Sequence, residues 1–235
     1  MKPRLPAAPV RTVDLRGVGF DAFLAHAFDR TSDAWHVDEA QPSTDLRVDP
    51  ALQLAHAEKL LRAPAVLQRF TPAQRQQGLW FLPGWFQPDF FSQQIWNHDL
   101  PLGARISCVA AIEVLYRDLF AQEPHGTDAH MWFDLLEDAA PGKPGDSAAG
   151  VFCKECEPVR RTLLGVLDSV LAMPGDHCRR AALHGLNHWG TAAERARIID
   201  AWLSRLTAAE LDATAPGARQ SLRSFAQLCR AGRYQ

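Results

Sequence analysis

The chain has 235 residues, of which 47% are hydrophobic and 22% charged, values typical of a globular protein with a substantial core. Its net charge of −2 and pI of about 6.5 disfavour a dedicated nucleic-acid-binding protein, which usually carries a strongly basic surface. No apolar run approaches the roughly 18 residues of a membrane span, and no signal-peptide segment is visible at the N-terminus, so neither a membrane partner nor secretion is expected.

Helix signals dominate the pattern along the chain, and alternating β-branched runs are almost absent. Residues 1–17 begin with three prolines in the first dozen positions and predict an extended arm, and the polar residues 31–48 predict a loop. The predicted helices lie near residues 18–29, 50–69, 72–82, 89–98, 102–121, 128–138, 152–172, 177–189, 192–206 and 216–231.

Local signals fix several of these helix ends. Capping boxes begin at Thr71, Thr191 and Thr207, where Gln or Glu follows three residues later. Asp176 is a plausible N-cap for the helix near 177–189. The helix near 50–69 should break before Pro64, because a residue that precedes proline avoids the α region.

Helices joined by short turns predict antiparallel neighbours stacked in order. We therefore expect one all-α domain over residues 18–235, built as a short HEAT-like solenoid or an irregular helical bundle. A loop or subdomain break is expected at 139–150, where proline and glycine cluster.

Residues 181–189 (AALHGLNHW), followed by a capped helix with Ile198, Ile199, Trp202 and Leu206, resemble the HEAT-like repeats of bacterial helical proteins. The resemblance covers the C-terminal third and implies a scaffold that binds other proteins. The HEAT-like proteins also include an enzyme class, the alkyl-base DNA glycosylases, which carry a basic clamp. The acidic balance of this chain departs from that pattern.

The helix near 177–189 places three histidines, His177, His184 and His188, in a narrow arc beside an apolar stripe. His184 and His188 are one turn apart and can chelate zinc if a third ligand comes from elsewhere. The first interpretation is structural, with the imidazoles hydrogen-bonded to neighbouring helix ends or loops, and the zinc site is the alternative. Gly185 weakens the helix by about 1 kcal/mol relative to alanine, which suggests that another helix or a ligand approaches closely there.

The chain has five cysteines, an odd number that does not indicate a disulfide framework, and we expect reduced thiols in a cytoplasmic protein. Cys153 and Cys156 form a lone C-x-x-C pair. Free thiols are the first interpretation, a zinc site completed by His177 and Cys178 is the second, and redox chemistry is the third.

Aromatic residues cluster between positions 80 and 96, partly on turns made by proline and glycine. Such rings either fill the core or line a groove for a partner, because tryptophan and tyrosine are enriched in interface hot spots. The predicted partner contacts are Trp80, Phe81, Trp85, Phe86, Phe90, Trp96 and Trp189.

A further face carries His130, Asp134, Glu137 and Asp138 at helical spacing. A His–Asp pair one turn apart could orient a general base, although such a face is more often simply solvated.

Together these features predict a non-enzymatic protein-binding module, an adaptor or an inhibitor of the immunity-protein type, with no cofactor and another protein as its partner. The alternative is a metal-dependent or acid–base enzyme built around His184 and His188 with His130 and Asp134. A third hypothesis is DNA binding through C-terminal arginines, which requires Arg160–Arg161 and Arg179–Arg180 to share a surface. The arginines concerned are Arg195, Arg197, Arg205, Arg219 and Arg223.

Overall fold

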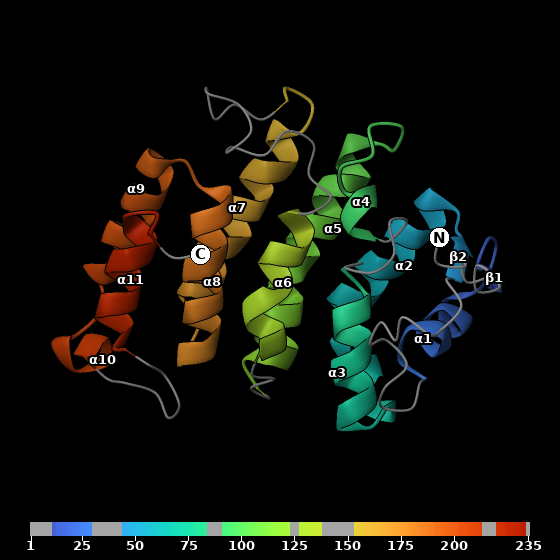
Figure 1. Cartoon of the computed structure of the whole chain (residues 1–235), viewed down its shortest axis with the longest axis horizontal. Helices are drawn as coiled ribbons and strands as arrows, with labels where there is room; N and C mark the ends of the chain where they lie inside the picture. Colours follow the sequence, from blue (N-terminus) through green and yellow to red (C-terminus); the bar gives the residue numbers. More distant parts are fainter. Residues whose placement is uncertain are drawn as a thin grey trace, which may run out of the picture.

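The computed structural model describes residues 11–29, 44–83, 91–122, 127–137, 153–212 and 220–233. These residues are mostly helical, with only two short strands, so the predicted all-α class is confirmed (Figure 1). The helices are α1 (Phe20–Phe28), α2 (Pro50–Arg62), α3 (Pro72–Phe81), α4 (Phe91–Gln94), α5 (Leu102–Leu115), α6 (Thr127–Glu137), α7 (Glu157–Leu171), α8 (Asp176–Trp189), α9 (Ala192–Leu203), α10 (Ala208–Asp212) and α11 (Leu222–Arg230), with a 3-10 turn η1 (Pro64–Arg69) after α2 and a π-helical turn η2 (Tyr116–Phe120) after α5.

The caps predicted from the sequence define several helix starts. Thr71 with Gln74 and Thr191 with Glu194 form reciprocal capping boxes, in which each threonine hydroxyl accepts from the amide three residues ahead. Asp49, which was not predicted as a cap, also begins a helix: its carboxylate accepts from the amides of Ala51 and Leu52 in the first turn of α2.

Two predicted helix ends need comment. Helix α2 ends at Arg62 and gives way to η1 at Pro64, as the proline predicts. The N-cap of α8, however, is Gly175 rather than Asp176. Gly175 adopts a positive φ of 100°, a conformation that favours glycine, and Asp176 pairs instead with Arg180 one turn along.

Two short strands were not predicted. β1 (Arg11–Asp14) and β2 (Thr44–Arg47) pair in parallel, with Arg11 opposite Thr44. Each strand has four residues, too few for a period-two pattern to stand out, and the pairing joins segments about thirty residues apart. β1 lies in the segment predicted as an extended arm, and β2 at the end of the predicted loop.

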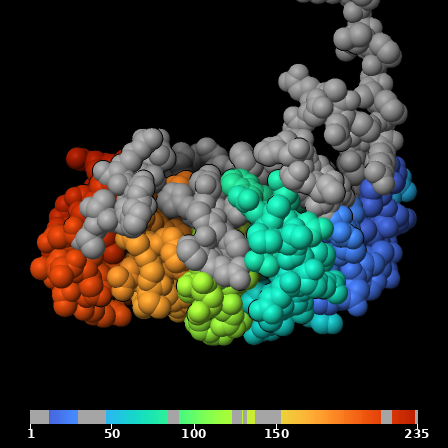
Figure 2. Space-filling view, turned by 90° about the horizontal axis from the view of Figure 1, so that it is seen from below, coloured from blue at the N-terminus to red at the C-terminus, as the bar shows by residue number. Residues whose placement is uncertain are grey.

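The helices form two adjacent rows (Figure 1). Helices α2, α5 and α7 contact one another in turn in one row, and α3, α6, α8 and α11 do so in the other. Figure 2 shows the chain proceeding along the array from its N-terminal to its C-terminal helices. A regular HEAT-like superhelix stays a prediction.

A continuous apolar core runs between the two rows and includes the large side chains Phe28, Tyr116, Trp132 and Trp189. No helix within the described segments is both long and apolar enough to cross a bilayer.

Candidate metal centre

Three potential metal ligands meet between α6 and α8: Asp134, His184 and His188. One ligand atom from each residue lies within 4.8 Å of those of the other two. His188 Nε2 is 3.1 Å from His184 Nε2 and 3.3 Å from Asp134 Oδ1, and His184 Nδ1 is 3.5 Å from Asp134 Oδ2.

Helical spacing accounts for the two histidines, because residues four apart lie one above the other on the same face. Asp134 arrives from α6, which packs along α8. The sequence interpretation named Asp134 and the two histidines together in its enzyme alternative, and the structure brings these three residues into contact.

Gly185 allows this close approach. A Cβ added at Gly185 would lie 2.6 Å from Leu167 Cδ2 and 2.9 Å from Phe133 Cβ, closer than van der Waals contact permits. The expectation that another helix comes close to Gly185 is therefore confirmed: α6 and α7 both do. Because Phe133 precedes Asp134, the contact that excludes a side chain at position 185 also sets the distance between Asp134 and His184.

Tryptophan indoles fix helix α6 at its C-terminal half. Trp189 donates to the carbonyl of Phe133 at 3.0 Å, and Trp96 donates to the carbonyl of Leu136 at 3.2 Å. The two indoles stack on each other with their centroids 5.4 Å apart. Carbonyls in the last turn of a helix have no partner within the helix, so Trp96 satisfies one that the helix leaves open.

The metal-ligand cluster lies at the edge of the core. The His184 side chain is only 6% exposed, whereas Asp134 is 16% and His188 22% exposed. His184 is thus enclosed by packed helices, whereas parts of the His188 and Asp134 side chains are exposed.

Two of the printed distances suit a tetrahedral ion, whereas the 3.5 Å contact of Asp134 is with Nδ1 of His184, the ring nitrogen that faces away from His188. With zinc–nitrogen and zinc–oxygen bonds of about 2.0–2.1 Å, tetrahedral geometry places neighbouring ligand atoms about 3.3 Å apart. The separations of 3.1 and 3.3 Å that His188 Nε2 makes with its two neighbours are close to that edge length.

No family model, curated protein or solved structure matches the chain. The chemistry of the centre therefore has to be inferred from its own geometry.

His177 is not part of this centre. Its Nε2 donates to the carbonyl of Phe120 at 2.7 Å, at the end of η2. This is the structural role that the sequence left open for the histidine row.

The predicted aromatic groove needs correction. Phe81, Trp96 and Trp189 are at most 4% exposed and belong to the core, where two of them clamp α6. Trp80 is partly buried. The remaining predicted contacts, Trp85, Phe86 and Phe90, lie outside the described residues, as do Asp138 and the side chains of His130 and Glu137. A tryptophan ring can be buried when its N–H donates to a buried carbonyl. The sequence pattern does not show whether such a carbonyl is present, so it could not distinguish a core position from a groove.

The cysteine prediction is also corrected. Cys153 and Cys156 are joined as a disulfide rather than carrying free thiols. The proposed partners His177 and Cys178 lie on α8 and do not contact them; burial raises the pKa of Cys178 to about 11. The neighbour of the pair is His98, which sequence analysis missed because it lies 55 residues before Cys153 and belongs to no local motif.

Two of the arginines named for DNA binding make contacts within the fold. Arg160 donates to the carbonyl of Trp189 at the C-terminal end of α8, and Arg180, in the first half of the same helix, donates to the carbonyl of Gln220. DNA binding through the C-terminal arginines stays a prediction. Several other arginines are engaged by carboxylates, as in the pairs of Arg223 with Asp212 and Arg230 with Asp200.

Proposed function

We propose that this protein binds zinc through Asp134, His184 and His188 and uses the ion to activate water for hydrolysis. The observation that carries the proposal is the convergence of a carboxylate and two imidazoles from two helices at separations close to the edges of a tetrahedron.

The number of ligands favours a catalytic over a purely structural ion. Structural zinc sites are closed by four protein ligands, whereas catalytic sites use three and keep one position for water or substrate. The described residues offer three, and the His188 side chain is 22% exposed, so it is the ligand least enclosed by the fold. An ion bound there would lower the pKa of its water to about 7 and supply a nucleophile at neutral pH.

Two buried features support pre-organisation of the ligands. His184 is held in the core, and Asp134 is positioned by a helix whose carbonyls are hydrogen-bonded to Trp96 and Trp189. Ligands held in this way lose little conformational freedom when the ion binds.

The first test is the zinc content of the full-length protein, measured by elemental mass spectrometry after dialysis. We expect one zinc ion per chain in the wild type and none in a His184→Ala, His188→Ala double variant. Asp134→Asn should weaken zinc binding by about a hundredfold or more, since loss of a supporting group alone costs 10–100-fold. His177→Gln is the matched control, because it removes a histidine of α8 that lies outside the cluster, and it should retain zinc.

The second test measures hydrolysis of p-nitrophenyl acetate and bis(p-nitrophenyl) phosphate. We expect the zinc-loaded wild type to hydrolyse one of these probes faster than the double variant does. Tight zinc binding without any difference in hydrolysis would contradict a catalytic role, and absence of zinc binding would contradict the proposal as a whole.

A further inference from the structure

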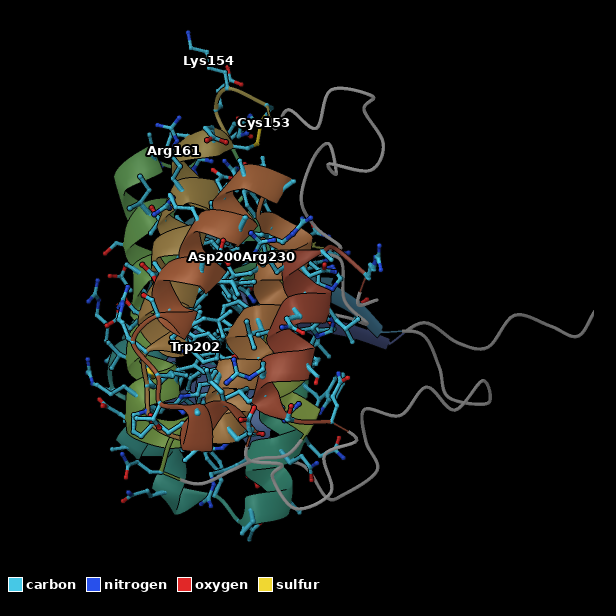
Figure 3. The ribbon with its side chains drawn as sticks, turned by 90° about the vertical axis from the view of Figure 1, so that its left-hand side faces the viewer. Cys153, Lys154, Arg161, Asp200, Trp202 and Arg230 are labelled. Atoms are coloured by element: carbon cyan, nitrogen blue, oxygen red, sulfur yellow. A yellow bond between two sulfur atoms is a disulfide. The ribbon has the colours of Figure 1, made fainter. Side chains whose placement is uncertain are left out.

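A second cluster lies before α7, on residues that the metal centre does not use. Cys153 and Cys156 are joined by a disulfide, and His98 Nε2 lies 3.2 Å from Cys156 Sγ and 3.9 Å from Cys153 Sγ. Figure 3 shows Cys153 and Lys154 at one end of the helical array. The bond is therefore at the molecular surface, although part of it faces inward.

The two sulfurs differ in accessibility. Cys156 has no exposed surface, whereas Cys153 is partly exposed and His98 is exposed. In thiol–disulfide exchange a thiolate attacks one sulfur of the disulfide, and access decides which one. We therefore expect an external thiolate to attack Cys153, the partly exposed residue, rather than the buried Cys156.

The buried sulfur has the surroundings of a good leaving group. Cys156 is the N-cap of the 15-residue helix α7, whose N-terminal end carries partial positive charge. His98 Nε2 is within hydrogen-bond distance of the same sulfur and can donate to a thiolate. The nearest carboxylate of α7, Glu157, is engaged by Arg160 and Arg161, which offsets its repulsion of a thiolate.

The Cys153–Cys156 disulfide contributes little to the stability of the fold. It joins residues three apart, and a disulfide that closes so short a loop restricts the unfolded chain least. The other three cysteines, Cys108, Cys178 and Cys229, are buried and free, so this pair alone among the described cysteines is both oxidised and reachable.

We propose that Cys153–Cys156 is a redox-active disulfide that exchanges with dithiols. A thiolate of the dithiol attacks Cys153 Sγ, a new sulfur–sulfur bond forms, and the Cys153–Cys156 bond breaks with its electron pair leaving on Cys156 Sγ. The second thiolate of the dithiol then attacks the dithiol sulfur that is bound to Cys153. This closes a disulfide within the dithiol and releases Cys153 as a thiolate. The dithiol is oxidised to a disulfide, and the protein gains two electrons and two protons as the reduced cysteine pair.

The test uses the oxidised full-length protein with dithiothreitol as the dithiol and glutathione disulfide as the trapping reagent. Without denaturant, dithiothreitol should make Cys153 available to alkylation, and alkylation after subsequent unfolding should find both Cys153 and Cys156 reduced, as counted by mass spectrometry. The Cys156→Ser variant should form a mixed disulfide with glutathione at Cys153. Its matched control, Cys153→Ser, should leave the buried Cys156 unmodified.

His98→Gln should slow reduction by dithiothreitol about tenfold, because the departing thiolate loses a charge-assisted hydrogen bond. His177→Gln, which touches neither sulfur, should not change the rate. A normal rate in His98→Gln, or a disulfide that dithiothreitol reduces only after unfolding, would overturn the proposal.

One more outcome would overturn it. Zinc held by reduced Cys153, Cys156 and His98 would make the cluster a metal site instead of an exchanging disulfide. Such zinc would be lost in Cys153→Ser and retained in the His184→Ala, His188→Ala variant. The two clusters share no residue, so the failure of either proposal leaves the other measurable.

Discussion

At the scale of single residues, Arg160 makes the most heavily bonded buried ion-pair network among the described residues. Its side chain is 5% exposed and donates to both oxygens of Glu157 and of Glu194, at 2.7–2.9 Å, and to the carbonyl of Trp189. These groups lie at the start of α7, the start of α9 and the end of α8. One guanidinium thus ties three helix ends together, and one of them is the end of α8, the helix that carries His184 and His188.

The pH dependence of stability should follow this network. The hydrogen bonds from Arg160 lower the pKa of Glu194 from 4.5 to about 2. Because the folded pKa is depressed, the carboxylate stabilises the fold above the unfolded value, and this contribution is lost as the pH falls from about 4.5 toward 2. We expect Glu194→Gln to flatten the decline in unfolding free energy over this range and to cost about 1–2 kcal/mol at neutral pH.

Urea unfolding at a series of pH values measures both effects. Glutamine preserves the capping box, as Gln74 does beside Thr71, so the substitution isolates the charge. Glu210→Gln is the control, because Glu210 also caps a helix but only meets Arg179 at 3.7 Å on the surface. Equal losses in the two variants would contradict a special role for Arg160.

At the scale of secondary-structure elements, the contact of α8 with α6 and α7 depends on Gly185. Gly185→Ala should gain about 1 kcal/mol of helix propensity yet lose stability by about 1–3 kcal/mol net, because the new methyl overlaps Leu167 and Phe133. The displacement of α6 should also weaken zinc binding, which calorimetric titration would measure.

Gly165→Ala is the matched control for this prediction. Gly165 also lies within a helix, α7, but an added Cβ there meets nothing within 4 Å. This variant should be as stable as the wild type or more so, by up to about 1 kcal/mol, with unchanged zinc affinity. A stabilised Gly185→Ala variant would mean that α6 and α8 pack less tightly than the structure shows.

Local sequence predicts local features at this scale. Capping boxes at Thr71 and Thr191 and the break before Pro64 each depend on residues within one turn, and the structure confirms them. The pairing of β1 with β2 depends on how two distant segments meet. The position of the N-cap at Gly175 depends on how the chain enters α8. A pattern confined to a few neighbours carries no information on either.

At the scale of the whole molecule, each of the two clusters combines residues that are close in the sequence, which the sequence analysis could pair, with a residue from a distant segment, which only packing brings near. The spacing of His184 and His188 predicted a chelating pair, and the His130–Asp134 face was recognised separately. The enzyme alternative joined this pair with His130 and Asp134, and the packing of α6 on α8 brings Asp134 to within 3.5 Å of both histidines. For Cys153 and Cys156 the sequence proposed the wrong histidine, because packing brings His98 to the start of α7.

Zinc binding should stabilise the whole chain, since its ligands come from two helices in the middle of the array. An ion that binds the folded state adds RT ln(1 + [L]/Kd), about 4 kcal/mol at a concentration about a thousand times Kd. For a chain of this length that corresponds to a rise in the unfolding midpoint of about 10 °C, which scanning calorimetry would detect, and a chelator should reverse it. His188→Ala should lose the zinc-dependent rise, whereas Glu194→Gln, destabilised at a different site, should keep it. A rise of equal size in His188→Ala would place the stabilising ion elsewhere, so the comparison tests the location of the centre as well as its existence.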